Sequence, residues 1–246
     1  MKREKDKKKL NLAIDIGNTN TKIGFANDET LTECSTVSAQ SPLPTLPQNA
    51  RVIVSNVREE THHHLIDLRK QYPDAIWLDE KTQLFFPIKT ERRDTIGTDR
   101  LAACAGALSL EKKGVDKLVI TTGTCITFNY IDRDRAFIGG AISPGYQMRL
   151  DAMHHFTGKL PKLSAEDQIP PHIGKDTDNN LHSGVFFGIC DEIDGRISRF
   201  IDVHRDYEIF ITGGHHLRLV NQSKYSIFAN SNLQLIGLLK ILEFQS

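Results

Sequence analysis

The sequence lacks several features that would place it in other protein classes. Over 246 residues it has no apolar run approaching the roughly 18 residues that cross a membrane. Lysine plus arginine number 31, and aspartate plus glutamate also number 31, so no net charge draws the chain to nucleic acid or an anionic membrane. The P-loop pattern is absent as well. We therefore expect a cytoplasmic protein with a sizeable core that binds neither nucleic acid nor membrane.

Cysteine and histidine give no sign of a disulfide framework or a zinc site. The cysteines are far apart in sequence and predict reduced thiols: Cys34, Cys104, Cys125 and Cys190. No histidine pairs with cysteine or glutamate at zinc-site spacing, and we expect the run His62–His64 to be solvated surface. The basic residues 1–9 have no apolar segment of signal-peptide length after them, so we expect a disordered tail.

Short strand patterns and helical patterns alternate along the chain. Strands are predicted at Leu12–Ile14, Lys22–Phe25, Leu31–Val37, Arg51–Val57, Ala75–Leu78, Lys117–Thr122, Cys125–Ile131, Arg135–Ile142, Glu208–Thr212 and Tyr225–Phe228. Helices are predicted at Glu59–Lys70, Gly97–Leu110, Gly145–Phe156, Asn179–His204 (with Gly188 as a candidate break), Gly213–Val220 and Leu233–Phe244.

The two halves of the chain repeat one another. Leu12–Gly17 aligns without gaps with Leu118–Gly123, 106 residues later, and Thr21 aligns with Thr127. A repeated hairpin followed by α/β units predicts two similar lobes, at residues 10–115 and 116–246. Ligands usually bind in the cleft that such lobes form.

The first glycine turn carries polar residues at almost every position. It reads Asp15-Ile16-Gly17-Asn18-Thr19-Asn20-Thr21-Lys22. Gly17 lets the backbone approach an anion, and the amide and hydroxyl side chains can donate to phosphate oxygens. Asp15 can hold Mg²⁺ directly or through water. The alternative is a plain hairpin turn, which leaves the acidic residue before the glycine unexplained.

Further glycine turns follow strands in the second half. Thr121–Thr124, with Thr127 beyond it, repeats the first turn, and two such turns can clasp a triphosphate. Thr212–Gly214 stands between a strand and a helix, where nucleotides often bind. The segment Ile138–Gly145 holds three glycines and a proline. It forms a pocket wall or a tight turn, and we assign it no chemistry.

The motif Gly97-Thr98-Asp99-Arg100 opens a helix rich in small residues. A helix start stabilises a negative group nearby. Asp99 can accept the proton of an attacking hydroxyl, and Arg100 can bind a carboxylate or the transferring phosphoryl group. The alternative is a helix cap with a local ion pair, and the residues alone do not decide between the two.

Taken in this order, the motifs resemble those of the type III pantothenate kinases, which belong to the superfamily of acetate and sugar kinases, heat-shock ATPases and actin. Asp15–Thr19 and Gly123–Thr127 are similar to the two phosphate motifs, and Thr212–Gly214 to the adenosine motif. Gly97–Arg100 is similar to the pantothenate motif, and Gly139–Gly145 to the family's Gly-Gly-x-Ile-x-Pro-Gly segment. The resemblance implies an α/β fold of duplicated ribonuclease-H-like lobes, the actin-like ATPase fold, with mixed five-stranded sheets flanked by helices and a cleft between the lobes.

The resemblance also implies a reaction: ATP-dependent phosphorylation of pantothenate to 4′-phosphopantothenate, the first step of coenzyme A biosynthesis. The enzyme implied is a homodimer that uses Mg²⁺ or another divalent cation and often K⁺ or NH₄⁺. Asp99 is the implied proton acceptor and Asp15 the implied metal ligand. The implied ATP-binding residues are Asp15, Ile16, Gly17, Asn18, Thr19, Asn20, Thr21, Lys22 and Thr124. Those for pantothenate are Gly97, Thr98, Asp99, Arg100 and Thr177 of the partner subunit.

The sequence departs from the family pattern at two places. Thr121 stands where the family usually has an aspartate that holds the monovalent cation, so we expect weak dependence on K⁺ or NH₄⁺. Thr90 and Arg93 stand where the family often has a tyrosine and a proline, so one aromatic wall of the substrate pocket is missing or comes from Phe85 or Phe86. Two other hypotheses therefore stay open: a non-catalytic accessory binding factor, and a kinase for another small hydroxy acid.

Overall fold

The computed structural model describes residues 10–28, 30–110, 113–214 and 216–245. The tail predicted at residues 1–9 lies outside them. The chain divides into two compact units. The first comprises Met1–Glu111 and Asn232–Ser246, and the second comprises Lys112–Ser231. Within the described residues, no helix combines the length and the apolar character that crossing a membrane requires.

The first unit is built on a mixed sheet of five strands in the order β3-β2-β1-β4-β5. The strands are β1 (Leu10–Ile16), β2 (Asn20–Asn27), β3 (Thr30–Ser38), β4 (Arg51–Asn56) and β5 (Ile76–Trp77). β1 runs antiparallel to β2 and parallel to β4. Its side chains from Leu12 to Ile14 are 0% exposed, because a central strand covered on both faces must be apolar on both. The edge strand β3 is mostly polar and exposed, which suits an unpaired edge.

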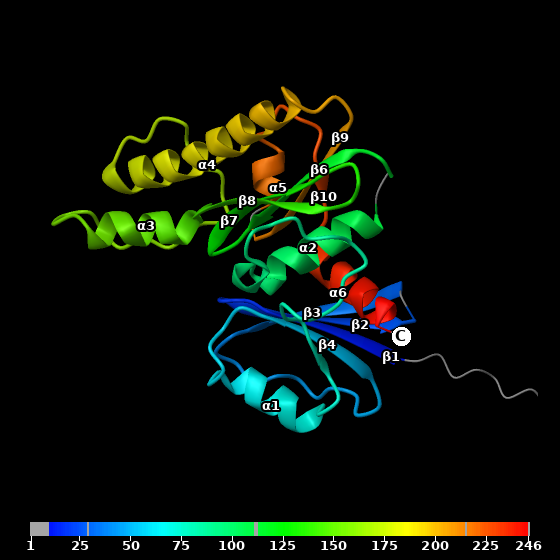
Figure 1. Cartoon of the computed structure of the whole chain (residues 1–246). Coiled ribbons are helices and arrows are strands. Elements are labelled where there is room, and N and C mark those ends of the chain that lie inside the picture. The colour runs from blue at the N-terminus through cyan, green and yellow to red at the C-terminus, as the bar shows by residue number, and fades with distance from the viewer. Residues whose placement is uncertain (1–9, 29, 111–112, 215, 246) are drawn as a thin grey trace, which may run out of the picture. The chain divides into compact units, whose positions relative to one another are not determined.

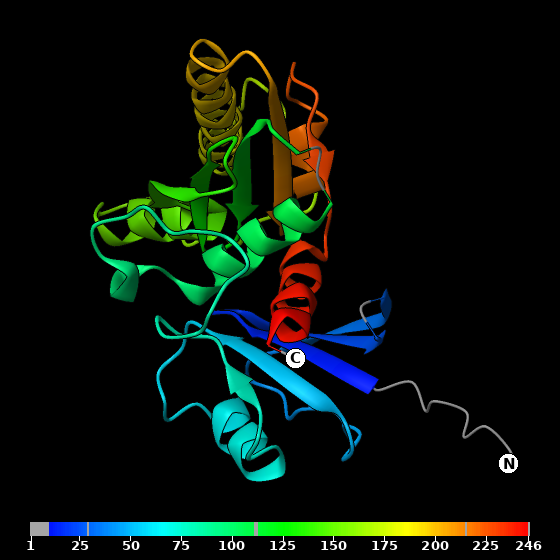
Figure 2. The same ribbon diagram turned by 45° about the vertical axis from the view of Figure 1, so that its right-hand side comes forward.

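Helices cover both faces of this sheet (Figures 1 and 2). α1 (His63–Gln71) lies on one face, while α2 (Thr98–Ser109) and α6 (Leu233–Phe244) lie on the other. A short 3₁₀ turn, Arg93–Thr95, precedes α2. The core under α1 consists of Leu12, Ile14, Ile16, Ile23, Leu46, Val52, Val54, Leu65, Leu68 and Tyr72.

The last helix departs from the predicted division into lobes at 10–115 and 116–246. α6 belongs to the first unit rather than the second. Its apolar side chains are buried nearly all round, and Gly237 lies against Ala102 of α2. A helix that is apolar on every side must be enclosed, and the space between α2 and β1 encloses it. The predicted boundary near residue 115 also moves, to Glu111/Lys112.

The second unit repeats this design with the strand order β10-β9-β6-β7-β8. Its strands are β6 (Asp116–Thr122), β7 (Cys125–Ile131), β8 (Phe137–Pro144), β9 (Tyr207–Gly213) and β10 (Phe228–Ala229). Its helices are α3 (Tyr146–His155), α4 (Thr177–Ile201) and α5 (His216–Val220), of which α3 and α4 pack side by side. α4 continues through Gly188, the predicted candidate break, because one glycine costs a helix only about 1 kcal/mol. β10 begins at the end of the predicted strand Tyr225–Phe228.

The internal repeat is therefore confirmed for the first strand of each unit and corrected for the second. Leu10–Ile16 and Asp116–Thr122 correspond end to end at the predicted spacing. Across the hairpins, however, Asp15 pairs with Lys22, whereas Thr121 pairs with Thr127. The second turn is one residue shorter than the first, so Thr127 corresponds to Lys22 and not to Thr21.

Gly237 makes the close contact of α6 with α2 possible. A Cβ atom there would lie 1.9 Å from the carbonyl oxygen of Ala102 and 2.5 Å from the amide nitrogen of Gly106. We predict that Gly237→Ala lowers the free energy of unfolding in urea by about 1–3 kcal/mol, the usual effect of overpacking. The matched control is Gly195→Ala in α4, where the added methyl group meets nothing within 4 Å. Better helix propensity should leave that variant at least as stable as the native chain. Equal stability of the two variants would contradict this packing account.

Candidate active site

The first glycine turn connects β1 to β2 and presents polar side chains to solvent. The Gly17 amide donates to the Asn20 carbonyl at 3.0 Å and closes the turn. Asn18, Thr19 and Asn20 are exposed, as a turn that meets phosphate requires. Ile16 is 0% exposed, so only its backbone is available to a ligand.

Thr21 differs from its predicted role as a phosphate ligand. Its side chain is 0% exposed, and its hydroxyl lies 2.8 Å from Nδ1 of His64. A buried hydroxyl that already has a partner is poorly placed to reach phosphate. Thr21 instead ties the turn to His64. His64 is also 0% exposed and His62 is half-buried, so the prediction that His62–His64 is solvated surface holds for the exposed His63 and is wrong for His64.

Asp15 is the charged group of this turn. It is 7% exposed, and its Oδ1 finds no hydrogen-bond partner among the residues that the structure describes. Burial and then the charge of Asp99 raise its pKa to about 6, against the lowering effects of a hydrogen bond with Ser55 and the charge of Lys22. Lys22, opposite Asp15 across the hairpin, has its own pKa lowered by burial. The apolar surroundings thus work against the charge on both groups.

The predicted substrate motif lies at the start of α2, within the same unit. The Thr98 hydroxyl lies 3.1 Å from the Asn56 amide, 3.0 Å from the Asn56 carbonyl and 3.0 Å from the Ser55 hydroxyl. Because these contacts occupy it, Thr98 ties the helix start to the end of β4 and is less suited to the predicted contact with substrate. Gly97 precedes the helix as its N-cap residue.

Asp99 follows at the second position of α2. Its Oδ1 accepts a hydrogen bond from the Arg100 amide at 2.8 Å. Burial raises its pKa, and the Arg100 amide and guanidinium oppose that rise. The pKa of Arg100 is itself lowered, mainly by burial. An acidic group with a raised pKa beside a guanidinium suits both proton acceptance and anion binding.

A divalent cation fits the two carboxylates. Asp99 is near enough for its charge to raise the pKa of Asp15, and Asp15 Oδ1 is buried with no hydrogen-bond partner among the described residues. Carboxylate oxygens are the ligands that Mg²⁺ prefers, and a nearby positive charge would relieve their repulsion. Asp15 is the residue that would hold the ion.

The second unit has hydroxyl groups where the first has charges. Thr121 and Thr127, the counterparts of Asp15 and Lys22, form a hydroxyl–hydroxyl bond of 2.7 Å. Asn129 donates to the Thr127 hydroxyl at 2.9 Å. Thr121 is 7% exposed and offers no carboxylate. Thr124, predicted to bind ATP, lies in the turn itself and is exposed.

The predicted adenosine motif lies beside this second turn. β9 runs parallel to β6, and their register pairs Thr122 with Gly213. Gly213 has a φ of +102°, and a Cβ there would lie 2.1 Å from the Thr122 carbonyl oxygen, so only glycine fits. The Thr122 hydroxyl donates to the carbonyls of Thr212 and Gly214 at 3.0 and 2.6 Å. A small, mainly apolar cavity adjoins them, lined by Thr122, Gly123, Ile126, Tyr146, Phe186, Ile189, Gly214 and Leu219.

The remaining predicted residues are placed as follows. Gly145 donates its amide to the Thr124 carbonyl at 2.9 Å, so the Ile138–Gly145 segment supports the second turn through its backbone. Thr177 is the exposed first residue of α4, after the N-cap Asp176. Phe86 is buried, and Phe85 packs on it and on Phe244, so both rings serve the core of the first unit.

Sequence reasoning missed the polar residues at the end of β4 and just after it. Ser55, Asn56 and Arg58 bond to Thr98, to one another or to the turn, and Arg58 Nε donates to the Gly17 carbonyl at 2.8 Å. The signal was present, because the apolar part of the strand gives way to polar residues at its end. Parallel strands β1 and β4 end at the same edge of the sheet, where such a run meets the first turn.

Known proteins resemble this chain over most of its length. Residues 11–199 match the profile of the family described as type III pantothenate kinase. A type III pantothenate kinase of Cytophaga hutchinsonii is 36% identical over 238 residues, covering 96% of this chain and 99% of its own. One from Bacteroides fragilis is 37% identical over 243 residues, with the same coverage.

Solved structures support the fold. A conserved Campylobacter jejuni protein assigned to the Baf family of transcriptional activators superposes with a TM-score of 0.60 at 23% identity, covering 95% of this chain and 98% of its own. Component A of (R)-2-hydroxyglutaryl-CoA dehydratase from Acidaminococcus fermentans gives a TM-score of 0.53 at 11% identity, with 96% and 97% covered. The fold is the actin-like ATPase fold, with two five-stranded mixed sheets flanked by helices. From the profile match and the near-complete alignments, the chain belongs to the type III pantothenate kinase family.

Proposed function

We propose that this chain transfers the γ-phosphoryl group of ATP to the primary hydroxyl of pantothenate, giving 4′-phosphopantothenate, the first step toward coenzyme A. The observation that carries the proposal is a pair of desolvated carboxylates: the buried Asp15, at the end of a strand beside an exposed glycine turn, and the half-buried Asp99, at a helix start. A protein that only binds a nucleotide has little use for two carboxylates whose burial disfavours their charge. The pair therefore argues against a non-catalytic accessory factor.

In this reaction Asp99 accepts the proton of the attacking hydroxyl. Its raised pKa makes it a stronger base than an ordinary aspartate, while the Arg100 amide holds Oδ1 in place. Arg100 binds the carboxylate of pantothenate or the transferring group. Gly97 and Thr98 shape the same part of the site as Asp99 and Arg100. Thr98 does so through its hydrogen bonds to β4.

In this proposal the first glycine turn, Asp15–Lys22, contacts the nucleotide phosphates through its backbone and through side chains other than that of the buried Thr21. Thr124 of the second turn is a separate proposed contact of ATP. A divalent cation bound with ATP would neutralise charge that develops on the phosphates. Asp15 would hold that ion, since its Oδ1 is buried and has no other partner among the described residues.

The assembly we propose is a homodimer in which Thr177 of the partner subunit reaches pantothenate. Its support is family membership and the exposure of Thr177 at the start of α4. In the proposed reaction, K⁺ or NH₄⁺ contributes little to the rate. A hydroxyl stands at Thr121, so K⁺ or NH₄⁺ has no carboxylate to bind there.

ATP consumption with pantothenate, set against a panel of sugars and other hydroxy acids, tests the proposed reaction. Turnover that requires pantothenate supports it. Turnover with another member of the panel and none with pantothenate would instead indicate a different small-molecule kinase, and no turnover with any would favour the accessory factor.

We predict that Asp99→Asn lowers kcat by about 10²- to 10⁴-fold, the usual contribution of a general base. The KM values for ATP and pantothenate should stay near the native ones, because the amide keeps the size of the side chain. Asp94→Asn is the control, since Asp94 is exposed and bonds only to Arg92 in the interactions described. Retention of more than about a tenth of the native rate in Asp99→Asn would exclude Asp99 as the base.

Asp15 should make stability depend on pH when no divalent cation is present. Its pKa is about 6 in the fold against 3.8 for an ordinary aspartate, so the folded state favours the protonated form. The stability that protonated Asp15 contributes to the fold is complete below about pH 4 and is lost as the pH rises through about 6. We predict that the free energy of unfolding falls, relative to Asp15→Asn, by about 2–3 kcal/mol between pH 4 and pH 7. Mg²⁺ should restore part of the lost free energy of unfolding in the native chain but not in Asp15→Asn. A difference that does not change with pH would contradict the raised pKa.

The neutral pair Thr121 and Thr127 predicts weak monovalent-cation dependence. Rates at saturating Mg²⁺ should change by less than about tenfold when K⁺ replaces a bulky organic cation at fixed ionic strength. Thr121→Asp should create or strengthen the dependence by placing a carboxylate beside the Thr127 hydroxyl. A larger stimulation of the native enzyme would show that K⁺ binds without that carboxylate.

A further inference from the structure

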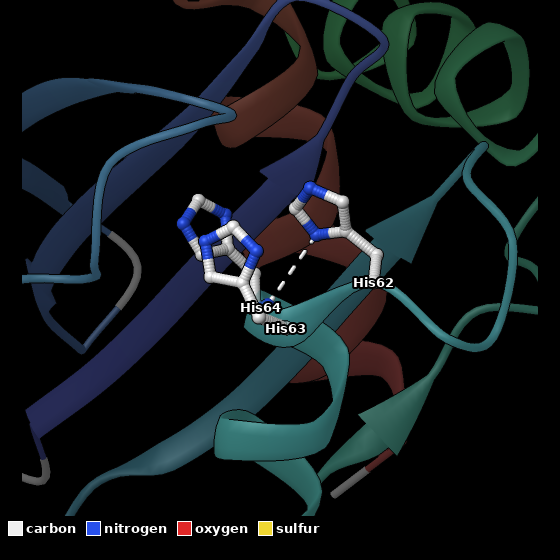
Figure 3. A group of neighbouring side chains, drawn as sticks. All are labelled: His62, His63 and His64. Carbon is white, nitrogen blue, oxygen red and sulfur yellow. Dashed lines mark hydrogen bonds between the residues drawn. The ribbon is translucent and has the colours of Figure 1, made fainter.

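A set of side chains behind the first glycine turn has no part in the proposed chemistry. His62 and His64 begin α1, and Arg58 lies just before it. Figure 3 shows the histidine rings gathered at the first turn of the helix, with the His64 amide donating to Nδ1 of His62 at 3.3 Å. These residues all belong to the first unit.

Three hydrogen bonds hold the turn, two from these side chains and one from the backbone of a neighbouring loop. Arg58 Nε donates to the Gly17 carbonyl at 2.8 Å. The Ala39 amide donates to the Thr19 carbonyl at 2.9 Å. The third contact joins the Thr21 hydroxyl to Nδ1 of His64 at 2.8 Å. The backbone at Gly17 and Thr19 and the side chain of Thr21 are therefore each held by a hydrogen bond from outside the turn.

The histidines also fix the loop that supplies the Ala39 amide. His62 Nε2 donates to the Ala39 carbonyl at 3.1 Å, and His64 Nε2 donates to the Ser41 carbonyl at 2.7 Å. Since a carbonyl can only accept, both Nε2 atoms carry hydrogen, and each Nδ1 is left to accept in the neutral ring. Burial lowers the pKa of both histidines, which favours the neutral rings that these bonds need.

We propose that His64, assisted by His62 and Arg58, is a positioning residue that sets the geometry of the phosphate-binding turn and thereby the affinity for ATP. We call these three side chains the histidine latch. His64 is fully buried, so it acts through Thr21 and the Ser41 loop and not by touching nucleotide. The inference rests on the proposed use of this turn for ATP.

The cluster is less suited to a metal ion. One ligand atom from each of His62, His63 and His64 lies within 4.8 Å of the others. Both ring nitrogens of His62 and of His64 are already in hydrogen bonds, however, so an ion would have to break the contacts that hold the turn. The geometry therefore favours the positioning role.

Binding of a fluorescent ATP analogue with Mg²⁺, without pantothenate, tests the latch. His64→Gln keeps a donor for the Ser41 carbonyl and loses the partner of Thr21, and we expect its Kd to rise about tenfold. His63→Gln is the matched control, because His63 is exposed and water can replace its 3.2 Å contact with the Ser41 carbonyl. Its Kd should stay within about twofold of the native value. In the kinase assay, His64→Gln should raise KM for ATP and leave KM for pantothenate unchanged, a split that a general loss of structure would not produce.

Native affinity in folded His64→Gln, or equal weakening in His63→Gln, would overturn the proposal. If His64→Gln does not fold, Thr21→Val removes the same hydrogen bond from its other end. Tenfold weaker binding in that variant supports the latch, and unchanged binding overturns it. A native chain that binds the analogue but phosphorylates no member of the substrate panel would refute the proposed reaction and leave the latch standing.

Discussion

Desolvation of two carboxylates in the first unit, the buried Asp15 and the half-buried Asp99, is the constraint around which the site is arranged. Residues on either side of Asp15 are fully buried, and the neighbouring charge adds to the desolvation that raises its pKa to about 6. Such a pair persists only where the surrounding groups over-determine it. Ser55 bonds to Asp15, Thr98 fixes the start of α2 to β4, and the Arg100 amide holds Asp99. The sheet order makes this possible by ending β1 and β4 at one edge.

The two units use the same strand order for different chemistry. In the first, Asp15 and Lys22 face one another across the hairpin, while the equivalent positions in the second are Thr121 and Thr127. Charge in the first unit suits metal binding and proton transfer. The hydroxyl and backbone groups of the second suit neutral contacts, and its glycine at 213 lets two strands approach closely. Duplication has thus supplied one scaffold whose halves are specialised by a few side chains.

Much of this could be predicted from sequence, because it depends on local patterns. The hairpins, the start of α2 and the 106-residue repeat follow from apolar alternation and glycine turns, which act over a few residues. The packing of α6 in the first unit could not be predicted, because its enclosure depends on α2, far away in sequence. Thr21 and Thr98 have the right residue type for phosphate or substrate, but long-range partners at His64 and Asn56 occupy their hydroxyls. His62 and His64 look like surface in the sequence, but both bond to the loop at residues 39–41, and His64 is fully buried.

Direct titration of Asp15 tests the central claim most plainly. Carboxyl-carbon NMR of chain labelled at aspartate, with Asp15→Asn to assign the resonance, reports the pKa of that group in the absence of metal. The account predicts a value of about 6, falling when Mg²⁺ and a nucleotide are added, and a lower value in Asp99→Asn, where the neighbouring charge is gone. An Asp15 that titrates near the ordinary 3.8 and is indifferent to Asp99 would contradict the pair of desolvated carboxylates on which the proposed catalysis depends.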